Sequence, residues 1–175
     1  GSVRALAVDL RGFGDSDTLP VDATRGVRDF SDDVASVLDA LAVEDAHVVG
    51  WSMGGGVAMQ LLIDRPELVT SLTLVSPVSP YGFGGTDAEG RILDPSEPGV
   101  GGGGANPDFV TRLVEQDRSA DAPTSPRTVL RTAYVADPGS IADHEDVWVE
   151  SMLSTRTGAD NYPGDASSAD AWPGF

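Results

Sequence analysis

Residues 46–58 read AHVVGWSMGGGVA, which places the pattern G-x-S-x-G between an apolar β-branched run and a helical segment. The run His47-Val48-Val49 predicts a buried strand, and the Ala/Leu-rich residues that follow predict a helix. Ser52 would then occupy a turn too sharp for bulky neighbours. Gly50 and Gly54 are expected to remove Cβ atoms where strand and helix come closest, and the next two glycines to ease the helix start against the sheet.

This geometry would expose the Ser52 hydroxyl at the carboxyl end of the strand. The backbone N–H of Met53 would lie at a helix N-terminus, where unpaired amides and the helix dipole favour an oxyanion. A serine beside such a donor is the arrangement that acyl transfer requires. The alternative is that a glycine-flanked serine forms only a tight turn; the strand before it and the helix after it favour the catalytic interpretation.

A second motif lies near the start of the chain. The apolar run from Val3 to Val8 predicts a strand buried in a parallel sheet, and it leads into DLRGFGDS, residues 9–16. Gly12 and Gly14 would allow a tight loop, in which Arg11 ties together Asp9 or nearby carbonyls. A phosphate-binding loop is the alternative, but a third glycine and the G-K-[ST] pattern are missing. The loop is therefore interpreted as scaffold.

Together, DLRGFGDS and GWSMGGG resemble the α/β-hydrolase superfamily. The resemblance implies an α/β fold with a parallel sheet flanked by helices, Ser52 as nucleophile and the Met53 amide as an oxyanion-hole donor. A serine at this position argues against the epoxide hydrolase and haloalkane dehalogenase branches, which use aspartate. Within the serine branch the chain is similar to esterases, to cofactor-free haloperoxidases or perhydrolases and to C–C bond hydrolases. No cofactor and no metal are expected.

The remaining pattern divides the chain into residues 1–79, a partial hydrolase core, and 80–175, a lid or cap. In the core, apolar residues at helical spacing from Val27 to Leu41 predict an amphipathic helix. A mostly apolar helix should follow Ser52 and stop before Pro66, ahead of a strand at 72–75. The solvent-exposed face of the first helix is expected to carry Asp29, Ser31, Asp32, Ser36 and Asp39.

The lid region begins with a glycine-rich stretch, residues 81–107, which has no periodicity. Short helices are predicted near 109–114, 128–135 and 141–153, followed by a turn-rich tail from 154 to 175. Trp51 and Trp148 are candidates for substrate binding. The wider set that could line an apolar acyl pocket adds Phe83, Phe109, Tyr134 and Trp172, with core packing as the alternative for each of them.

A serine hydrolase also needs a general base and an acid that orients it. The two histidines are His47, at the far end of the predicted elbow strand, and His144, in the lid. His47 is expected to be structural and His144 a solvated surface residue. No carboxylate directly follows the strand ending at Val75. We therefore expect a fragment that lacks the triad histidine and acid and is inactive alone; the alternative is a non-catalytic scaffold that binds a small ligand or a protein.

Composition limits the partners. The 175 residues include 28 acidic and 11 basic residues, all of the latter arginine, for a net charge of −17. Such a charge argues against nucleic acid and anionic membranes as partners, and a small-molecule acyl substrate is expected. There is no cysteine and no apolar run of about 18 residues, so a cytoplasmic location is expected. The sequence does not indicate an oligomeric state.

Overall fold

The computed structural model describes residues 3–22, 25–78 and 106–163. Within them the chain forms two compact units. Residues 3–11, 21–22 and 25–78 belong to the first unit, and residues 12–20 and 106–163 to the second. The predicted boundary after residue 79, the glycine-rich stretch up to 105, Phe83, Trp172 and the tail beyond 163 lie outside the described residues.

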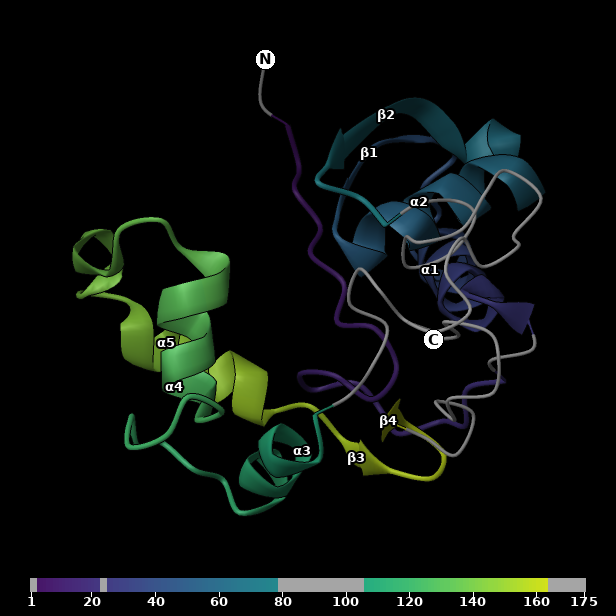
Figure 1. Cartoon of the computed structure of the whole chain (residues 1–175). Helices are drawn as coiled ribbons and strands as arrows, with labels where there is room; N and C mark the ends of the chain where they lie inside the picture. The colour runs from purple at the N-terminus through teal and green to yellow at the C-terminus, as the bar shows by residue number, and fades with distance from the viewer. Residues whose placement is uncertain (1–2, 23–24, 79–105, 164–175) are drawn as a thin grey trace, which may run out of the picture. The chain divides into compact units, whose positions relative to one another are not determined.

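The first unit is a parallel α/β arrangement (Figure 1). Strand β1 (Ala46–Trp51) pairs in parallel with β2 (Val69–Val75). Helix α1 (Arg28–Ala40) precedes β1, and α2 (Met53–Asp64) connects the two strands. The strand–turn–helix order of β1 and α2 and the end of α2 just before Pro66 confirm the prediction, and β2 begins three residues earlier than the predicted strand at 72–75. The buried core of this unit joins α1, α2 and the start of β2 through Ala35, Leu38, Leu61 and Leu68, with Val48 and Val69 packed against it.

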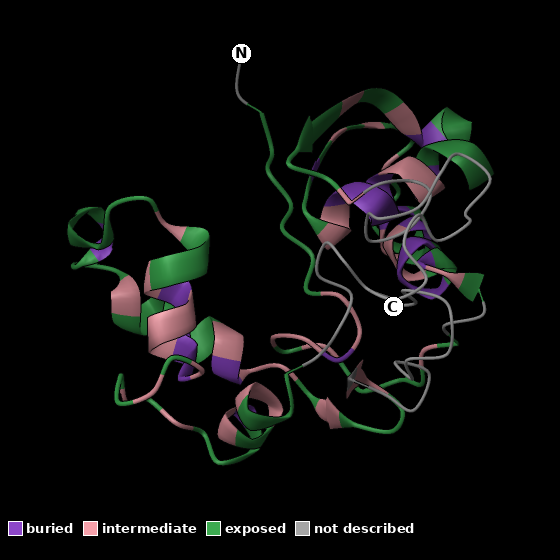
Figure 2. Ribbon diagram, viewed as in Figure 1, coloured by how far each residue is buried: buried purple, intermediate pink, exposed green. Residues whose placement is uncertain are grey.

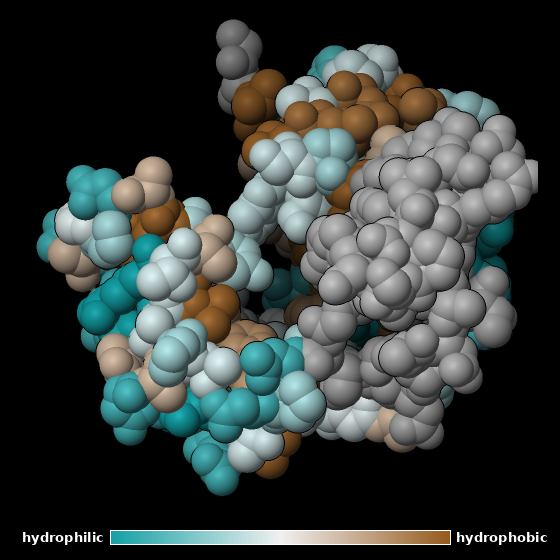
Figure 3. All heavy atoms as spheres, in the orientation of Figure 1, coloured by the Kyte–Doolittle hydropathy of each residue, from teal (hydrophilic) through white to brown (hydrophobic). Residues whose placement is uncertain are grey.

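One face of this two-stranded sheet is open in the part of the chain that the structure describes. Along β1, Val48 lies against the core, whereas Val49 is 68% exposed and Trp51 56%. Figure 3 shows hydrophobic residues gathered over β1 and β2. Parallel sheets are usually covered on both faces, so the described helices complete only one side of this one.

The strand predicted for residues 3–8 is not formed. This segment has no strand pairing, and it is exposed along its length (Figure 2), with Val3 93% exposed. An apolar run becomes a strand only when a neighbouring strand takes up its backbone hydrogen bonds. Among the described residues the sheet of the first unit contains only β1 and β2. Residues 3–8 therefore have no strand partner there, and their apolar composition alone does not make them a strand.

Two residues predicted on the solvent-exposed face of α1 are buried instead. Asp29 is 6% exposed and Ser31 is 1% exposed. The Asp29 carboxylate accepts a hydrogen bond from the Asp22 N–H at 2.7 Å and forms an ion pair with Arg25. A buried carboxylate is tolerated only when it is paired and hydrogen-bonded in this way, so partners in the segment before the helix, which helical periodicity does not reveal, make the burial of Asp29 possible.

Arg11 fastens the N-terminal loop to α1. Its Nε and Nη2 donate to the two oxygens of Asp33, each at 2.6 Å, and Nη2 also donates to the Asp29 carbonyl at 3.3 Å. The carbonyl that Arg11 contacts belongs to α1 and not to its own loop, and the main partner is a carboxylate on the same helix. The hydrogen bonds that Arg11 donates to Asp33 and the nearby acidic charges raise the pKa of Arg11, so its guanidinium stays charged.

Replacing Arg11 with Gln is expected to lower the free energy of unfolding by about 2 kcal/mol, because it leaves the carboxylates of Asp29 and Asp33 short of a cation in a part-buried place. Urea denaturation measures the change. The matched control is Arg28→Gln, which removes the more exposed pair with Asp64 and should cost less than about 1 kcal/mol. Equal losses in both variants would contradict the anchoring role of Arg11.

The second unit is a cluster of short helices. It contains α3 (Pro107–Val114), α4 (Pro126–Val129) continued by a π-helical turn (Leu130–Tyr134), a 3-10 turn (Pro138–Ile141) and α5 (Glu145–Leu153). The two-residue strands β3 (Thr157–Gly158) and β4 (Tyr162–Pro163) follow. Three helical stretches were predicted here, and helical structure forms in all three. Their shared core is Leu113, Leu130, Ile141, Val149 and Leu153.

A buried polar network supports this helical cluster. Ser125 is fully buried, and its hydroxyl accepts from Arg112 at 3.2 Å and lies 3.2 Å from a carboxylate oxygen of Asp117. Arg112 also pairs with Asp117 at 2.6 Å. Hydrogen bonds from Ser119 and Arg112 lower the pKa of Asp117 well below its ordinary value.

The second unit should therefore lose stability in acid. A carboxylate with a lowered pKa in the folded state stabilises fully above its unfolded pKa of about 3.9, and this contribution is lost as the pH falls further. We expect residues 106–163 to show faster hydrogen exchange at pH 3 than at pH 6, after correction for intrinsic rates. In Asp117→Asn that pH-dependent difference should shrink; an unchanged difference would show that other groups cause it.

No helix in the three described ranges is long and apolar enough to span a membrane.

Candidate active site

Ser52 sits at a strained turn between β1 and α2. Its backbone has φ 52° and ψ −121°, a positive φ that residues other than glycine rarely adopt. Such conformations cost on the order of 1–3 kcal/mol and persist only where the surrounding structure enforces them. Ser52 is also exposed. The predicted sharp turn with an exposed serine is therefore present.

The end of β2 and the residues that follow it hold the backbone of this turn through both its N–H and its carbonyl. The Ser52 N–H donates to the Val75 carbonyl at 3.1 Å, and the Ser52 carbonyl accepts from Val78 N–H at 3.1 Å. The same carbonyl accepts from Gly55 N–H at 2.9 Å. These three bonds leave the Ser52 backbone little freedom to relax into an ordinary conformation.

Close approach of backbone or side-chain atoms explains three of the four glycines. A Cβ at Gly50 would lie 2.4 Å from the Gly54 carbonyl oxygen, and one at Gly55 would lie 2.6 Å from Pro77 Cβ. A Cβ at Gly56 would lie 2.7 Å from a methyl of Val78. At Gly54 a Cβ would meet nothing within 4 Å, so the steric role predicted for that residue is wrong.

Met53 is the first residue of α2, as the oxyanion-hole prediction requires. No side chain caps this helix, although the Gly55 N–H donates to the Ser52 carbonyl. Unpaired amides at a helix N-terminus can receive a developing negative charge. The role of the Met53 amide stays a prediction that this geometry permits.

Neither histidine lies beside Ser52 in the first unit: His47 belongs to that unit but is far along the strand, and His144 belongs to the second unit. His47 lies at the start of β1, on the order of 16 Å of strand away, and its Nδ1 shares a 2.7 Å hydrogen bond with Ser71 Oγ on β2. This cross-strand bond agrees with the structural role predicted for it. His144 is exposed and immediately precedes α5 in the second unit.

The other predicted site residues are divided between the units. Trp51 ends β1 directly before Ser52, and Asp9 is exposed in the N-terminal segment of the same unit. Trp148, 42% exposed, and Tyr134, 54% exposed, belong to the second unit, as does Phe109, which packs on its core.

The glycine loop supports the second unit and shows no feature of a phosphate site. Gly12 and Gly14 have φ values of 79° and 54°. The Gly12 carbonyl accepts from Arg156 N–H at 2.7 Å, and Gly14 N–H donates to Ser154 Oγ at 3.1 Å. Both glycines therefore hold residues 154–156 in place, in agreement with the scaffold interpretation.

Sequence reasoning missed Ser76. This residue directly follows β2 and has a φ of 41°. It lies between Val75 and Val78, the two residues whose backbones hydrogen-bond to Ser52. The only signal in the sequence was a Ser-Pro pair after a strand, which is too common to single out.

Comparison with known proteins connects this geometry to a family. A family model described as "alpha/beta hydrolase fold" matches residues 3–114. The dihydrolipoyllysine-residue acetyltransferase component of the acetoin cleaving system of Cupriavidus necator is 48% identical over 79 residues, 45% of this chain and 20% of that protein. The 2-hydroxymuconate semialdehyde hydrolase of a Pseudomonas species (strain CF600) is 45% identical over 74 residues, 42% of this chain and 26% of that protein.

A solved structure extends the similarity beyond the elbow. The esterase RhEst1 from Rhodococcus sp. ECU1013 superposes with a TM-score of 0.55 at 25% identity and covers 85% of this chain. This chain covers 49% of that esterase, so it spans about half the length of the enzyme and a smaller share of the curated relatives.

Proposed function

Because the chain belongs to the alpha/beta hydrolase fold family, we propose that it carries the nucleophile of a serine hydrolase that acts on a carboxylic ester or a related small acyl substrate. One observation carries the proposal: a serine held at φ 52° on the turn between a parallel strand and a helix. Strain of this kind is concentrated at active sites.

The chemistry follows from the position of Ser52. Its Oγ attacks the substrate carbonyl carbon while a general base takes the hydroxyl proton, and the carbonyl oxygen becomes a tetrahedral oxyanion beside the Met53 N–H. Collapse expels the leaving group, which takes the proton from the base, and leaves an acyl-serine. Attack by water, with the same base accepting its proton, then releases the acid and restores Ser52.

The base and its orienting acid are proposed to lie outside these 175 residues. In support, His47 is bound to Ser71, and the chain covers only 49% of RhEst1. The open reading frame should therefore encode, outside these 175 residues, an acidic residue and a histidine that complete the site. A reading frame without them would contradict this part of the proposal and favour a non-catalytic binding scaffold.

The substrate class can be tested with the product of the whole open reading frame. We expect hydrolysis of p-nitrophenyl acetate and butyrate with saturation kinetics. A vinylogous 1,5-diketone and an aryl carbamate, assayed in parallel, distinguish C–C bond and carbamate hydrolysis from ester hydrolysis. Turnover of the esters alone supports an esterase, and turnover of the diketone alone assigns C–C cleavage to the same serine. If the protein turns over none of the three substrate classes, the proposed hydrolase activity is contradicted.

A further inference from the structure

Two neighbouring strand ends in the first unit have the same unusual backbone conformation. Strands β1 and β2 are paired so that Trp51 lies opposite Val75. The next residues along the two strands, Ser52 and Ser76, have positive φ values of 52° and 41°. A residue other than glycine rarely adopts such a φ, because its Cβ crowds the backbone. Two such residues that follow one pair of opposed strand positions need a common explanation.

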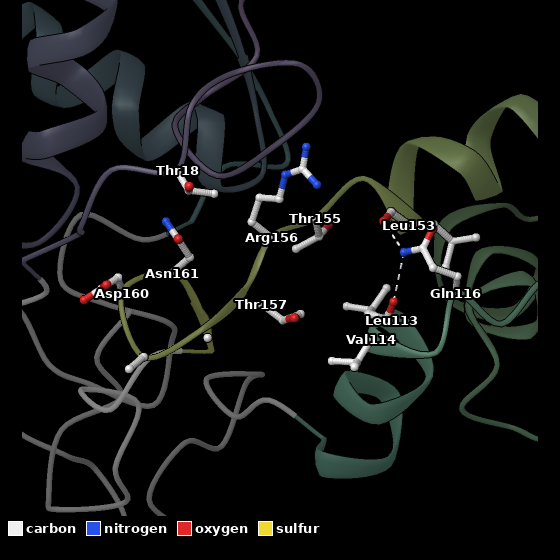
Figure 4. A pocket seen from close by; sticks show the side chains of 12 residues that line it. Thr18, Leu113, Val114, Gln116, Leu153, Thr155, Arg156, Thr157, Asp160 and Asn161 are labelled. Atoms are coloured by element: carbon white, nitrogen blue, oxygen red, sulfur yellow. Dashed lines mark hydrogen bonds between the residues drawn. The ribbon is translucent and has the colours of Figure 1, made fainter.

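The other positive-φ residues have an ordinary explanation. Within the described ranges the remaining non-glycine residues with a positive φ are Ala42 and Gln116. Each lies two positions past the last residue of a helix, α1 and α3 respectively, where a left-handed residue commonly ends a helix. The Gln116 side-chain amide also donates to the Leu113 and Leu153 carbonyls at 3.0 and 2.9 Å (Figure 4). Ser76 ends no helix, because it directly follows strand β2.

Hydrogen bonds join the turn at Ser76 to the turn at Ser52. The Ser52 N–H donates to the carbonyl of Val75, the residue before Ser76, and the Ser52 carbonyl accepts from the N–H of Val78, two residues after it. These two groups come from the ends of a four-residue segment, so the chain must bend between them, as it does in a β-turn. The second residue of such a turn is one of the places where a positive φ occurs. The φ of Ser76 is therefore what allows both bonds to Ser52.

Packing fixes the same segment to the start of α2. A Cβ on Gly55 would lie 2.6 Å from Pro77 Cβ, and one on Gly56 would lie 2.7 Å from a methyl of Val78. Both glycines belong to the first residues of α2, which begins at Met53. The ring of Pro77 restricts its own φ to about −65°, so the segment is stiff. A shift at Ser76 would therefore move the backbone around Ser52 and the helix start that carries the Met53 amide.

We propose that Ser76 is a positioning residue for the nucleophile. Its left-handed conformation places the Val75 carbonyl and the Val78 N–H where they hold Ser52, so it acts through the backbone and not through its hydroxyl. This role rests on the proposed function, in which Ser52 attacks the substrate. A displaced nucleophile slows the chemical step and leaves substrate binding nearly unchanged, so kcat and not KM is expected to report the role.

Ser76→Val tests the role in the product of the whole reading frame. A β-branched residue adopts a positive φ less readily than serine does, so the turn should shift. We expect kcat for p-nitrophenyl butyrate to fall about tenfold, with KM within about twofold of the wild type. Ser76→Gly accepts a positive φ without strain and should restore kcat to near the wild-type value. The matched control is Thr73→Val, which places valine in the paired part of β2, where β-branched residues fit; its kcat should be unchanged.

Amide hydrogen exchange provides a measurement that is independent of activity. In the ¹⁵N-labelled product of the whole reading frame, the Ser52 and Val78 amides should exchange faster in Ser76→Val than in the wild type and stay protected in Ser76→Gly. A wild-type protein that hydrolyses no ester would contradict the proposed function alone, because the exchange comparison would still show whether Ser76 holds Ser52.

Pro77→Ala is the second variant should Ser76→Val fold too poorly for kinetics. It keeps the Cβ that faces Gly55 but frees the φ of residue 77, and it should lower kcat about threefold with little change in KM. The positioning role is overturned by wild-type kcat in Ser76→Val and Pro77→Ala, or by unchanged exchange of both amides in Ser76→Val. A kcat as low in Ser76→Gly as in Ser76→Val would also overturn it, because the side chain and not the backbone would then be required.

Discussion

Gly50→Ala is expected to be among the most damaging single substitutions in the first unit. The added methyl would lie 2.4 Å from the Gly54 carbonyl oxygen and 2.7 Å from Gly55 Cα. Both are backbone atoms at the start of α2, so no side-chain rotation relieves the contact. Either β1 and α2 separate or the turn at Ser52 changes its conformation. We expect the free energy of unfolding to fall by about 3 kcal/mol or more.

Gly54→Ala is the matched control, because it adds the same methyl to the same motif. Nothing lies within 4 Å of a Cβ there, and residue 54 is helical. Alanine is the better helix former by about 1 kcal/mol, so this variant should be neutral or slightly more stable. Urea denaturation of both variants measures the contrast. A loss at Gly54 as large as at Gly50 would show that helix–strand clearance is not what these glycines provide.

Ser52→Ala is expected to remove hydrolytic activity almost completely in the product of the whole reading frame. Loss of the nucleophile of a serine hydrolase lowers kcat by roughly 10⁴-fold or more. Ser52→Gly should be equally inactive. The two variants should differ in stability, because alanine keeps the side-chain strain at φ 52° and glycine relieves it by on the order of 1 kcal/mol.

The comparison of the two variants separates catalysis from structure. We expect initial rates of ester hydrolysis near background for both, and a higher urea midpoint for Ser52→Gly than for Ser52→Ala. Residual activity above about a tenth of the wild type in Ser52→Ala would assign the nucleophile elsewhere. Equal midpoints would show that the turn at Ser52 stores no appreciable strain.

The elbow could be predicted from sequence because its determinants are local. Gly50, Ser52 and Gly55 are within six positions of one another, and the β-branched run and the apolar helix flank them directly. The spacing of apolar residues also predicts α1. The end of α2 before Pro66 follows from the effect of proline on the residue before it. Even here the pattern of glycines did not show at which of them a Cβ would meet neighbouring atoms. At Gly54 a Cβ would meet nothing within 4 Å.

Features set by contacts outside a single helix or strand could not be predicted. Residues 3–8 have the composition of a strand, but a strand also needs a partner. Asp29 has the character of a surface residue, yet Arg25 and the Asp22 amide make its burial possible. The positive φ of Ser76 depends on the backbone bonds between Ser52 and residues 75 and 78.

The most direct test of the central claim, that Ser52 is an activated nucleophile, is intact-mass analysis after incubation with a fluorophosphonate. For the product of the whole reading frame, the account predicts one phosphonyl adduct, located at Ser52 by peptide mapping and absent in Ser52→Ala. The 175-residue chain should stay unmodified under the same conditions, because its histidines are not expected to activate Ser52. An adduct that persists in Ser52→Ala, or no adduct on the whole protein, would contradict the claim.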